Sequence, residues 1–493
     1  MKTFYSASSA QQIDQYAIQQ LGIPGILLMK QAGFFAFQTL QKKFFPSTSN
    51  TALKTISVLC GTGNNGGDGF IVAQLAKQAG LTVHIYLFGE ANQLKDDALT
   101  AYQELQAIGI TTTPFNFATH QSTLQQSDVI VDAILGIGLD RPVTGQRFND
   151  IQQINQLNRP VLALDIPSGL HADTGNVLGA AIRATHTCTF ITQKIGLYSF
   201  QGSDIAGKVH YSPLYLKTNA FQSQTPIAYH HSLDHWLAQR PKPPASQHKG
   251  QAGTVCFIGG NHNMMGAIQL AARASLHTGA GLVKVITQTE HTIALTQQQP
   301  ELMCYDQNQL NAQVQHANVI AIGPGLGLDD WATQCYQAAL NHPQPKVMDA
   351  DALKLLAQTP QKQNNWILTP HPGEAAQLLN TTSQAIQADR IAAIHALHKK
   401  YGGIIVLKGN GTLVFDGEQV EICLAGNPRM AVGGMGDTLT GIIATLVTQG
   451  LSLWNAACLG VSLHAHAGDQ VAQKNRTAVL PSELTLQLCS LVK

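Results

Sequence analysis

Short apolar runs alternate with longer segments of helical periodicity along the chain, and they form two separate series. Continuous apolar runs flanked by helices are typical of a parallel sheet that is covered on both faces. Several runs end in Gly, Asp or Ser, and ligands of open α/β sheets bind outside the carboxyl ends of the strands. The first series comprises residues 55–61 (TISVLCG), 81–89 (LTVHIYLFG), 127–136 (SDVIVDAILG), 160–169 (PVLALDIPSG) and 184–192 (ATHTCTFIT).

The first series stops at a polar stretch, residues 217–249, which is rich in Pro and Gln and contains one short helical pattern at residues 233–237. A domain boundary is expected in such a linker. In the second series that follows, residues 412–415 and 420–424 predict a hairpin around an Asp-Gly-Glu turn. Its other runs are residues 253–260, 281–288, 317–325, 345–353, 366–374 and 403–408. The pattern therefore predicts an α/β protein of two tandem domains, residues 1–218 and 225–493.

No charged residue occurs between Thr438 and Gly468, but this segment does not have the pattern of a membrane span. Gly450 and Ser452 supply a helix stop and a helix start, so two helices are predicted. The polar residues Gln449, Asn455, His464 and His466 would be costly in lipid. Two buried helices of an α/β domain are expected instead, and no membrane partner.

Composition narrows the class of protein. The chain has 493 residues, too many for one ordinary core. Its net charge is +1, which gives no field that would favour nucleic acid or an anionic membrane. The eight cysteines are scattered, so we expect reduced, mostly buried thiols and a cytoplasmic protein. The first residues show no apolar signal core. Most soluble oligomers are homo-oligomers, and a homo-oligomer is expected here.

The most informative motif is residues 427–441 (NPRMAVGGMGDTLTG), in which three glycines precede Asp437 and a helical pattern follows. Glycines let the backbone approach a ligand closely, and free N–H groups at a helix start bind anions. A carboxylate there repels phosphate, so a suitable role for Asp437 is to take the proton from a hydroxyl that attacks a phosphoryl group. The alternative is a Gly-rich turn in which Asp437 caps the helix.

In the first domain, residues 61–69 (GTGNNGGDG) follow a strand and are expected to form a loop of bare backbone before a helix that opens at Phe70. Such a loop suits pyrophosphate. Asn65, Asp132 and Ser168 lie at neighbouring strand ends and offer hard oxygen ligands, which suit an alkali or alkaline-earth cation. Asp132 could instead cap a turn. Lys194 could pair with a carboxylate or a phosphate, or be a plain surface lysine.

The second domain offers further candidates at strand ends. Residues 408–412 (KGNGT) form a flexible loop with a cation and a hydroxyl suited to phosphates, or a plain hairpin turn. His371 is fixed between two prolines, which suits a binding role. Residues 323–327 (GPGLG) expose backbone. Asp349 and Asp351 could reach Mg²⁺ directly or through water, or cap a helix.

The motifs GTGNNGGDGF, VDAILGIG and LDIPSG, with residues 28–33 (LMKQAG), make residues 1–215 resemble the epimerase domain of the bifunctional NAD(P)H-hydrate repair enzymes. Thr62 replaces the proline that is usual in the loop of this family. The resemblance implies a Rossmann-like three-layer α/β/α fold. It places Asp165 at the reacting nicotinamide hydrate and K⁺ between Asn65, Asp132 and Ser168. The residues that it implies for binding the dinucleotide are Asn64, Asn65, Gly66, Gly67, Asp68, Gly136, Ile137, Gly138, Leu139, Asp140, Arg141 and Pro142.

Residues 225–493 resemble the ribokinase-like dehydratase domain of the same family, through GPGLG, DADAL, TPHPGE, KGNGT and the Asp437 motif. The resemblance implies repair of hydrated NADH and NADPH with ADP or ATP as co-substrate, ADP being the usual donor of the bacterial enzymes, and with Mg²⁺ in this domain. Ala267, Gly325 and His371 would lie near the hydrated nucleotide, and Asp437 at its reacting hydroxyl. The residues implied for holding ADP or ATP are Lys408, Gly409, Asn410, Gly411, Thr412 and Gly436.

Two other functions remain open at the level of sequence. The Asp437 motif also fits a small-molecule kinase, of the vitamin or sugar type, fused to a nucleotide-binding domain. The Asn-Asn-Gly-Gly-Asp loop of the first domain argues against such a kinase. A non-catalytic ligand sensor would be expected to have lost its site residues, whereas Asp68, Asp132, Asp165, His371 and Asp437 are all present. Return of NADH absorbance from hydrated NADH with ADP or ATP would separate the three.

Overall fold

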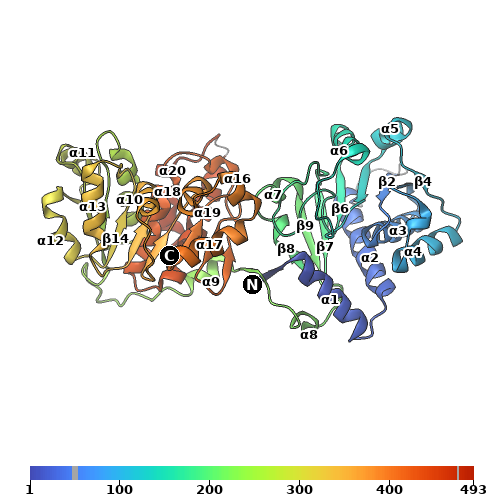
Figure 1. Ribbon diagram of the computed structural model, residues 1–493, viewed down its shortest axis with the longest axis horizontal. Helices are drawn as coiled ribbons and strands as arrows, with labels where there is room; N and C mark the ends of the chain where they lie inside the picture. The colour runs from blue at the N-terminus through green and yellow to red at the C-terminus, as the bar shows by residue number, and fades with distance from the viewer. Residues whose placement is uncertain (47–53, 475–476, 493) are drawn as a thin grey trace. The chain divides into compact units, whose positions relative to one another are not determined.

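The computed structural model describes residues 1–46, 54–474 and 477–492. The chain divides into two compact units, which we call the N-terminal unit (Thr3–Ala228) and the C-terminal unit (Tyr229–Lys493 with Met1–Lys2). The division falls within the polar stretch at residues 217–249 where a boundary is predicted. Figure 1 shows that both units are built from sheets flanked by helices, so each unit is an α/β domain in its own right.

The sheet of the N-terminal unit has the strand order β4-β3-β2-β5-β6-β7-β9, and every pairing in it is parallel. This is the strand order of a Rossmann sheet. The chain adds strands on one side of β2 as far as β4, and then adds them on the other side from β5 onward. A short strand, β1, pairs with β8 in parallel, with Phe4 opposite Gln193. The strands are β1 (Lys2–Tyr5), β2 (Thr55–Cys60), β3 (Thr82–Leu87), β4 (Thr113–Pro114), β5 (Val129–Ala133), β6 (Val161–Leu164), β7 (His186–Phe190), β8 (Gln193–Lys194) and β9 (Lys208–Ser212).

Helices cover both faces of this sheet, as the side chains of β2 demonstrate. Ile56 and Val58 pack in one core with residues of α1 to α4, whereas Leu59 packs on the opposite face with residues of α5 and α6. Successive side chains of a strand point to opposite faces, so the continuous apolar run is explained by burial on both. The helices are α1 (Ala7–Gln19), α2 (Gly25–Phe44), α3 (Asn64–Gln78), α4 (Asp96–Ala107), α5 (Phe117–Gln126), α6 (Gly145–Gln156), α7 (Gly202–Ile205) and α8 (Thr218–Phe221), with 3-10 turns η1 (Ala91–Gln93) and η2 (Ile195–Leu197).

The sheet of the C-terminal unit follows the order β13-β12-β11-β14-β15-β16-β17-β18-β19-β10. Its pairings are parallel from β13 to β17, and β17, β18 and β19 are antiparallel, which confirms the predicted hairpin. This order also reverses direction between two neighbouring strands, β11 and β14. The strands are β10 (Ala228–His230), β11 (Thr254–Ile258), β12 (Leu282–Ile286), β13 (Leu302–Tyr305), β14 (Val319–Ile322), β15 (Lys346–Met348), β16 (Trp366–Leu368), β17 (Ile404–Leu407), β18 (Leu413–Phe415) and β19 (Val420–Ile422).

The uncharged segment beginning at Thr438 forms two helices, α18 and α19, as predicted, and Ser452 caps the second of them. Both are largely buried in one core with α10 and α20. Among the described residues, none of the helices has the length and apolarity that crossing a membrane requires. The helices are α9 (Leu233–Leu237), α10 (Met265–Thr278), α11 (Thr292–Gln298), α12 (Leu310–Gln315), α13 (Asp330–Leu340), α14 (Ala350–Gln358), α15 (Pro372–Leu379), α16 (Ser383–Ala388), α17 (Arg390–Tyr401), α18 (Met435–Thr448), α19 (Leu453–Ala472) and α20 (Pro481–Leu491), with 3-10 turns η3 (Thr289–His291), η4 (Gln307–Gln309) and η5 (Pro428–Met430).

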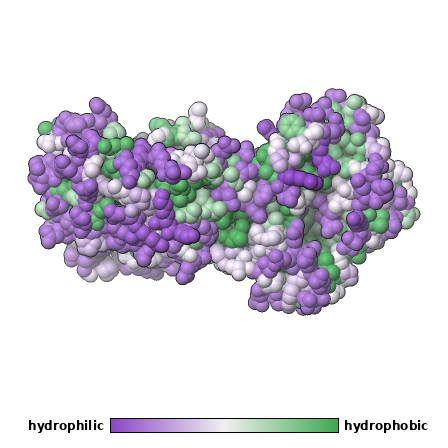
Figure 2. Space-filling view, viewed as in Figure 1, coloured by the Kyte–Doolittle hydropathy of each residue, from purple (hydrophilic) through white to green (hydrophobic). Residues whose placement is uncertain are grey.

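The visible surface of both units is mainly hydrophilic, and apolar residues are scattered over it in small groups (Figure 2). Charged residues make up only 12% of the chain, so uncharged polar side chains provide much of this surface. The apolar runs that predict the strands are accordingly buried in the cores of the two units.

Candidate active sites

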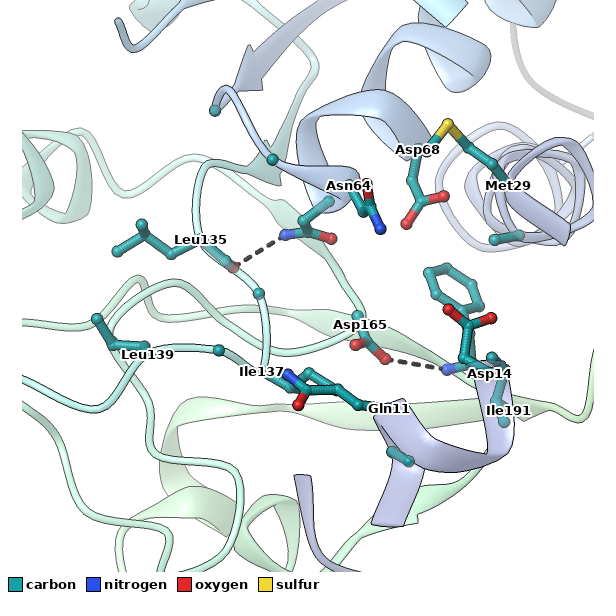
Figure 3. A pocket seen from close by; sticks show the side chains of 18 of the residues that line it. Gln11, Asp14, Met29, Asn64, Asp68, Leu135, Ile137, Leu139, Asp165 and Ile191 are labelled. Carbon is teal, nitrogen blue, oxygen red and sulfur yellow. Dashed lines mark hydrogen bonds between the residues drawn. The ribbon is translucent and has the colours of Figure 1, made fainter. Parts of the chain in front are cut away.

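A cavity of about 540 Å³ opens in the N-terminal unit where the strand order reverses. Its walls come from the turns that follow β2, β5 and β6 and from helices α1 and α2 (Figure 3). The predicted site residues that line it are Asn64, Asn65, Asp68, Gly136, Ile137, Gly138, Leu139, Asp140, Arg141 and Asp165. Pro142 instead lines an adjoining cavity of about 630 Å³, which shares Leu135, Leu139, Arg141 and Arg147 with the first.

The expectation of a long loop before a helix at Phe70 is wrong, because α3 already begins at Asn64. The glycines of this segment allow the first residues of α3 to pack closely against neighbouring segments. A β-carbon on Gly66 would lie 1.9 Å from the carbonyl oxygen of Gly61, and one on Gly69 would lie 2.7 Å from the Ala133 β-carbon. Only glycine allows such an approach. Gly66 and Gly69 therefore allow the start of α3 to pack against the turn after β2 and against β5, and Asn64, Asn65 and Asp68 are presented to the cavity from a helix.

At the end of β6, Asp165 forms an ion pair with Lys194. The Lys194 side chain is only 1% exposed, so the alternative of a plain surface lysine is wrong. Its ammonium also donates to the carbonyl of Phe190 at 2.8 Å. Asp165 has a φ of 58°, a left-handed conformation that is uncommon for a residue with a side chain. A buried ion pair and an uncommon backbone conformation together fix this carboxylate at the cavity wall.

Two more carboxyl groups share the cavity. Burial is the main cause that raises the pKa of Asp68 well above its usual value, and Asp165 and Asp14 raise it further. Burial also raises the pKa of Asp14 to about 6, with added repulsion from Asp165 and Asp97 and a smaller opposing effect of Lys194. Asp14, on α1, was missed by the sequence reasoning. The sequence does contain one sign of a role for Asp14, because it is the sole acidic residue before Asp68.

Of the proposed cation ligands, Asn65 lines this cavity, whereas Asp132 and Ser168 are buried and do not line it. Ser168 donates to both oxygens of Asp132, through its hydroxyl at 2.6 Å and its N–H at 2.8 Å. Burial raises the pKa of Asp132 to about 6, although these hydrogen bonds lower it. The amide nitrogen of Asn65 donates to the Leu135 carbonyl at 2.9 Å, while its Oδ1 atom is buried without a hydrogen-bond partner. The Asn65 amide oxygen thus lacks a hydrogen-bond partner, and the Ser168 hydroxyl and the Asp132 carboxylate supply further oxygen atoms. Such a set of oxygen ligands fits a weakly charged cation.

In the C-terminal unit, Asp437 lies in the first turn of α18. The capping alternative is wrong, because the N-cap is Gly434, with a φ of 94° that suits glycine. Burial raises the pKa of Asp437 to about 7; repulsion from Asp349, Glu374 and Asp351 adds to this, and Lys408 opposes it. A carboxyl group poised near neutral pH is suited to general acid–base work.

Lys408 is the cation of this cluster. Its Nζ atom lies 2.6 Å from Asp349 Oδ1 and 3.7 Å from Glu374 Oε2. Burial alone would lower the pKa of Lys408, but Asp349, Glu374 and Asp437 together raise it. A β-carbon on Gly436 would lie 3.1 Å from Lys408 Nζ, so the glycine leaves room for the ammonium beside Asp437. Lys408 thus joins the KGNGT loop to the Asp437 motif.

The other candidates of this unit are at two places. His371 is the N-cap of α15: its Nδ1 accepts from the N–H of Gly373 at 2.9 Å, and the N–H of His371 donates to the Glu374 carboxylate at 2.7 Å. This reciprocal cap keeps the half-exposed imidazole at a fixed angle. Ala267, in the helix after β11, and Gly325, in the turn after β14, lie together beyond the ends of these neighbouring strands. A β-carbon on Gly325 would approach that of Ala267 to 3.2 Å.

Beneath the KGNGT loop lies Arg390, which the sequence reasoning missed. Its guanidinium is buried and donates to the carbonyls of Leu407, Lys408 and Gly411 at 3.1 to 3.3 Å. Burial lowers the pKa of Arg390 to about 10, so it stays charged at neutral pH. Gly409 and Gly411 have φ of 135° and 67°, conformations that require glycine. The loop is therefore held from below rather than flexible.

The carboxylates proposed for Mg²⁺ already have partners. Asp349 accepts from Lys408 and, at 3.0 Å, from Thr440, and its side chain does not cap α14. Asp351 accepts from the Gly327 N–H and from Lys354. Over residues 1–46, 54–474 and 477–492, no group of three or more His, Cys, Asp or Glu side chains is arranged to hold a metal ion. A divalent cation here would need ligands from a bound nucleotide.

The fold and the two sites define a two-domain α/β enzyme for nucleotide ligands. Residues 26–196 match the family described as YjeF-related protein N-terminus, and residues 255–489 match NAD(P)H-hydrate dehydratase. The chain is 41% identical to the bifunctional NAD(P)H-hydrate repair enzyme Nnr of Coxiella burnetii over 96% of each chain. It belongs to the family of bifunctional NAD(P)H-hydrate repair enzymes.

Solved structures support the fold of the C-terminal unit. A ribokinase-like superfamily protein of Enterococcus faecalis matches 55% of this chain and 96% of its own, with 31% identity and a TM-score of 0.52. An ADP/ATP-dependent NAD(P)H-hydrate dehydratase of Bacillus subtilis, co-crystallised with ATP and Mg²⁺, matches 54% of this chain and 97% of its own, with 27% identity and a TM-score of 0.50. The predicted ribokinase-like α/β fold is confirmed.

Proposed function

We propose that the protein repairs hydrated NADH and NADPH in two steps. The N-terminal unit interconverts the R and S hydrates. The C-terminal unit dehydrates the S hydrate with ADP or ATP, which yields NADH or NADPH, phosphate, and AMP or ADP. The observation that carries this proposal is the presence of two different acid–base sites in one chain: Asp165 paired with buried Lys194, and Asp437, with its raised pKa, beside the ion pair of Lys408 and Asp349.

The dehydration uses phosphate as a leaving group, because hydroxide leaves poorly. Asp437 takes the proton of the ring hydroxyl while this oxygen attacks the terminal phosphoryl group of the nucleotide. The lone pair of the ring nitrogen then expels phosphate and restores the dihydronicotinamide. The pKa of about 7 allows Asp437 to accept the proton at neutral pH. Removal of this carboxylate should therefore stop the chemistry without emptying the site.

The nucleotide lies along the loop of residues 408–412 and the start of α18. The backbone N–H groups of Gly409 to Thr412 and of Gly436 face its phosphates, and Lys408 supplies a positive charge. Mg²⁺ bound with the phosphates would neutralise part of their charge, and Asp349 and Asp351 lie near enough to the loop to be candidates for contacting it through water. Ala267, Gly325 and His371 bind the hydrated nucleotide on the other side. The reciprocal cap that fixes His371 supports this placement.

In the N-terminal unit, the dinucleotide lies along the first turn of α3 and the turn at residues 136–142. Its nicotinamide end reaches Asp165. Asn65, Asp132 and Ser168 would hold K⁺, which would supply positive charge in a site that contains several carboxyl groups and would receive a pyrophosphate. The buried, unpartnered Oδ1 of Asn65 supports this cation site.

One assay tests the whole proposal. A mixture of R and S hydrated NADH is incubated with the full chain, Mg²⁺, K⁺ and either ADP or ATP, and NADH absorbance is followed. Rapid return of the whole pool is expected. If only the S fraction were converted to NADH, the proposed epimerase activity would be contradicted. If no NADH formed with either nucleotide, the proposed dehydratase activity would be contradicted. Phosphorylation of a stable vitamin or sugar hydroxyl without NADH formation would favour a kinase.

A further inference from the structure

Asp14 turns its carboxyl group into the same cavity as Asp165, from a different element. Asp165 follows β6, whereas Asp14 lies in the middle of α1, and both line the cavity (Figure 3). Gln11 and Ile18, each about one turn of α1 away from Asp14, also line the cavity, as does Gly25, which begins α2. A β-carbon on Gly25 would lie 2.1 Å from Asp97 Oδ2, so Asp97 closes the cavity on this side.

The charges around Asp14 do not balance if every carboxyl group is ionised. Asp68, Asp97 and Asp165 all face it, and Lys194 is the cation that acts on it. Arg141 and Arg147 are exposed and line the adjoining cavity as well. One buried ammonium is paired with Asp165, which also accepts from the N–H of Phe190 at 3.2 Å. The remaining carboxyl groups therefore repel one another, and protonation relieves this repulsion.

Of these groups, Asp14 is suited to exchange a proton near neutral pH. Burial, Asp165 and Asp97 raise its pKa to about 6, whereas the pKa of fully buried Asp68 is raised well beyond its usual range. An acid whose pKa is close to the working pH is the most effective proton donor. A cavity that holds one ion-paired carboxylate and one protonated carboxyl group has separate acid and base partners.

We propose that Asp14 is the general acid of the epimerisation and that Asp165 is its partner base; this deepens, and rests on, the proposed epimerase function. The hydroxylated ring carbon lies next to the ring nitrogen, so it is a hemiaminal carbon. Asp14 gives its proton to the hydroxyl, the C–O bond breaks, and the nitrogen lone pair forms a C=N bond as water leaves. Water then adds to the opposite face, the C=N electron pair returns to nitrogen, and Asp165 takes the proton.

The two carboxyl groups exchange protonation states in each turnover. Asp14 ends ionised and Asp165 ends protonated, which is the form that catalyses the reverse conversion. Exchange of protons with solvent restores the starting form. The hydroxyl oxygen of the product comes from water, so each epimerisation in ¹⁸O-labelled water should place one label in the hydrate.

The test uses the full chain and purified R hydrate, whose conversion to S is followed over pH. The wild-type rate should fall as pH rises above about 6, because the acid form of Asp14 is lost. Asp14→Asn should lower the rate about 100-fold and remove this pH dependence. Asp14→Glu should recover part of both. Gln15→Asn, an exposed change on the same helix, should keep the wild-type rate and profile. Unchanged amide exchange of β2 shows that each variant is folded.

The outcomes separate this inference from the function on which it rests. A wild-type protein that leaves the R hydrate unchanged would remove the epimerase itself. A wild-type protein that epimerises, with Asp14→Asn equal to it in rate and pH profile, would overturn the role of Asp14. Epimerisation without ¹⁸O incorporation would overturn the loss and return of water at the ring carbon.

Discussion

The ammonium of Lys408 lies 2.6 Å from Oδ1 of Asp349, and this buried pair sets the electrostatic surroundings of Asp437. Burial is the main cause that raises the pKa of Asp437 to about 7; Asp349 raises this pKa further, and Lys408 lowers it. The basicity of the proposed catalytic carboxylate therefore depends on Asp349 and Lys408, which follow β15 and β17, as well as on α18.

Asp437→Asn should reduce dehydration by about 10²- to 10⁴-fold, because the amide keeps the shape of the side chain and cannot accept a proton. Nucleotide binding and epimerisation should remain nearly unchanged. Wild-type dehydration should decline as pH falls through about 7, since the base becomes protonated. Asp330→Asn is a matched control, because Asp330 is exposed in the first turn of α13. Turnover with ADP at several pH values, and nucleotide affinity by calorimetry, provide the measurements. If Asp437→Asn dehydrated the hydrate at the wild-type rate, the proposed role of Asp437 as the base would be wrong.

Lys408→Met should shift the acidic limb of the dehydration pH profile to higher pH, because Lys408 lowers the pKa of Asp437 in the wild type. It should also destabilise the C-terminal unit by about 3–5 kcal/mol, since Asp349 is left buried without its cation. Lys354→Met removes the more exposed partner of Asp351 and should change stability by less than about 1 kcal/mol. Urea unfolding and pH-dependent turnover measure the two effects. Equal stability of the two variants would show that the Lys408 pair does not contribute as described.

Arg390→Met should raise the KM for ADP or ATP at least about tenfold, because three carbonyls of the nucleotide loop lose their buried donor. Arg390→Lys should recover part of the affinity, as one ammonium cannot reach all three oxygens. Lys399→Met on the exposed side of α17 is the control. Steady-state kinetics and nucleotide titration distinguish this effect from a loss in kcat. A lower kcat with unchanged KM would contradict the positioning role.

Asn65→Ala should raise the K⁺ concentration that half-activates epimerisation, because the unpartnered Oδ1 of Asn65 is the ligand that it removes. High K⁺ should restore part of the rate, whereas Na⁺ or Li⁺ should do so less well. Dehydration of the S hydrate by the same variant serves as the internal control. A rate that is equally low at every K⁺ concentration would assign Asn65 to substrate binding alone.

The two units should fold when they are expressed as residues 1–224 and 225–493, because each has its own sheet and core. The C-terminal piece should repair the S hydrate at enzymatic speed and the R hydrate only as fast as it epimerises spontaneously. Adding the N-terminal piece should restore rapid repair of both. Rapid repair of both hydrates by the C-terminal piece alone would contradict the division of labour.

Local patterns were sufficient for most strands and for the residues of contiguous motifs. The turns after β2, β5 and β6 meet at one cavity because parallel strands bring their carboxyl ends together. The start of α3 was misplaced because its glycines resemble a loop, whereas the close contact between Gly66 and Gly61 makes them a packing requirement. Short edge strands such as β4 and β9 carry too few apolar residues for a pattern.

Residues that reach a site from a distant helix were not predictable in the same way. Asp14 and Arg390 lie outside every motif, and their importance comes from the tertiary contacts that bury them. Lys194 was left undecided because a lysine in a short apolar stretch has no sequence mark of burial; its 1% exposure distinguishes the ion pair from a surface residue. Asp437 was placed correctly near a helix start, but the cap is Gly434.

The buried guanidinium of Arg390 also determines which way the peptide groups above it face. In a trans peptide the carbonyl and the following N–H point in opposite directions, and none of the described peptide bonds is cis. Because the carbonyls of Lys408 and Gly411 point toward Arg390, the N–H groups of Gly409 and Thr412 must point away from it. A cation on the inner side of the loop thus orients uncharged donors on its outer side. The anion recognition proposed for this loop can then be changed from beneath, by a residue that does not touch the proposed ligand.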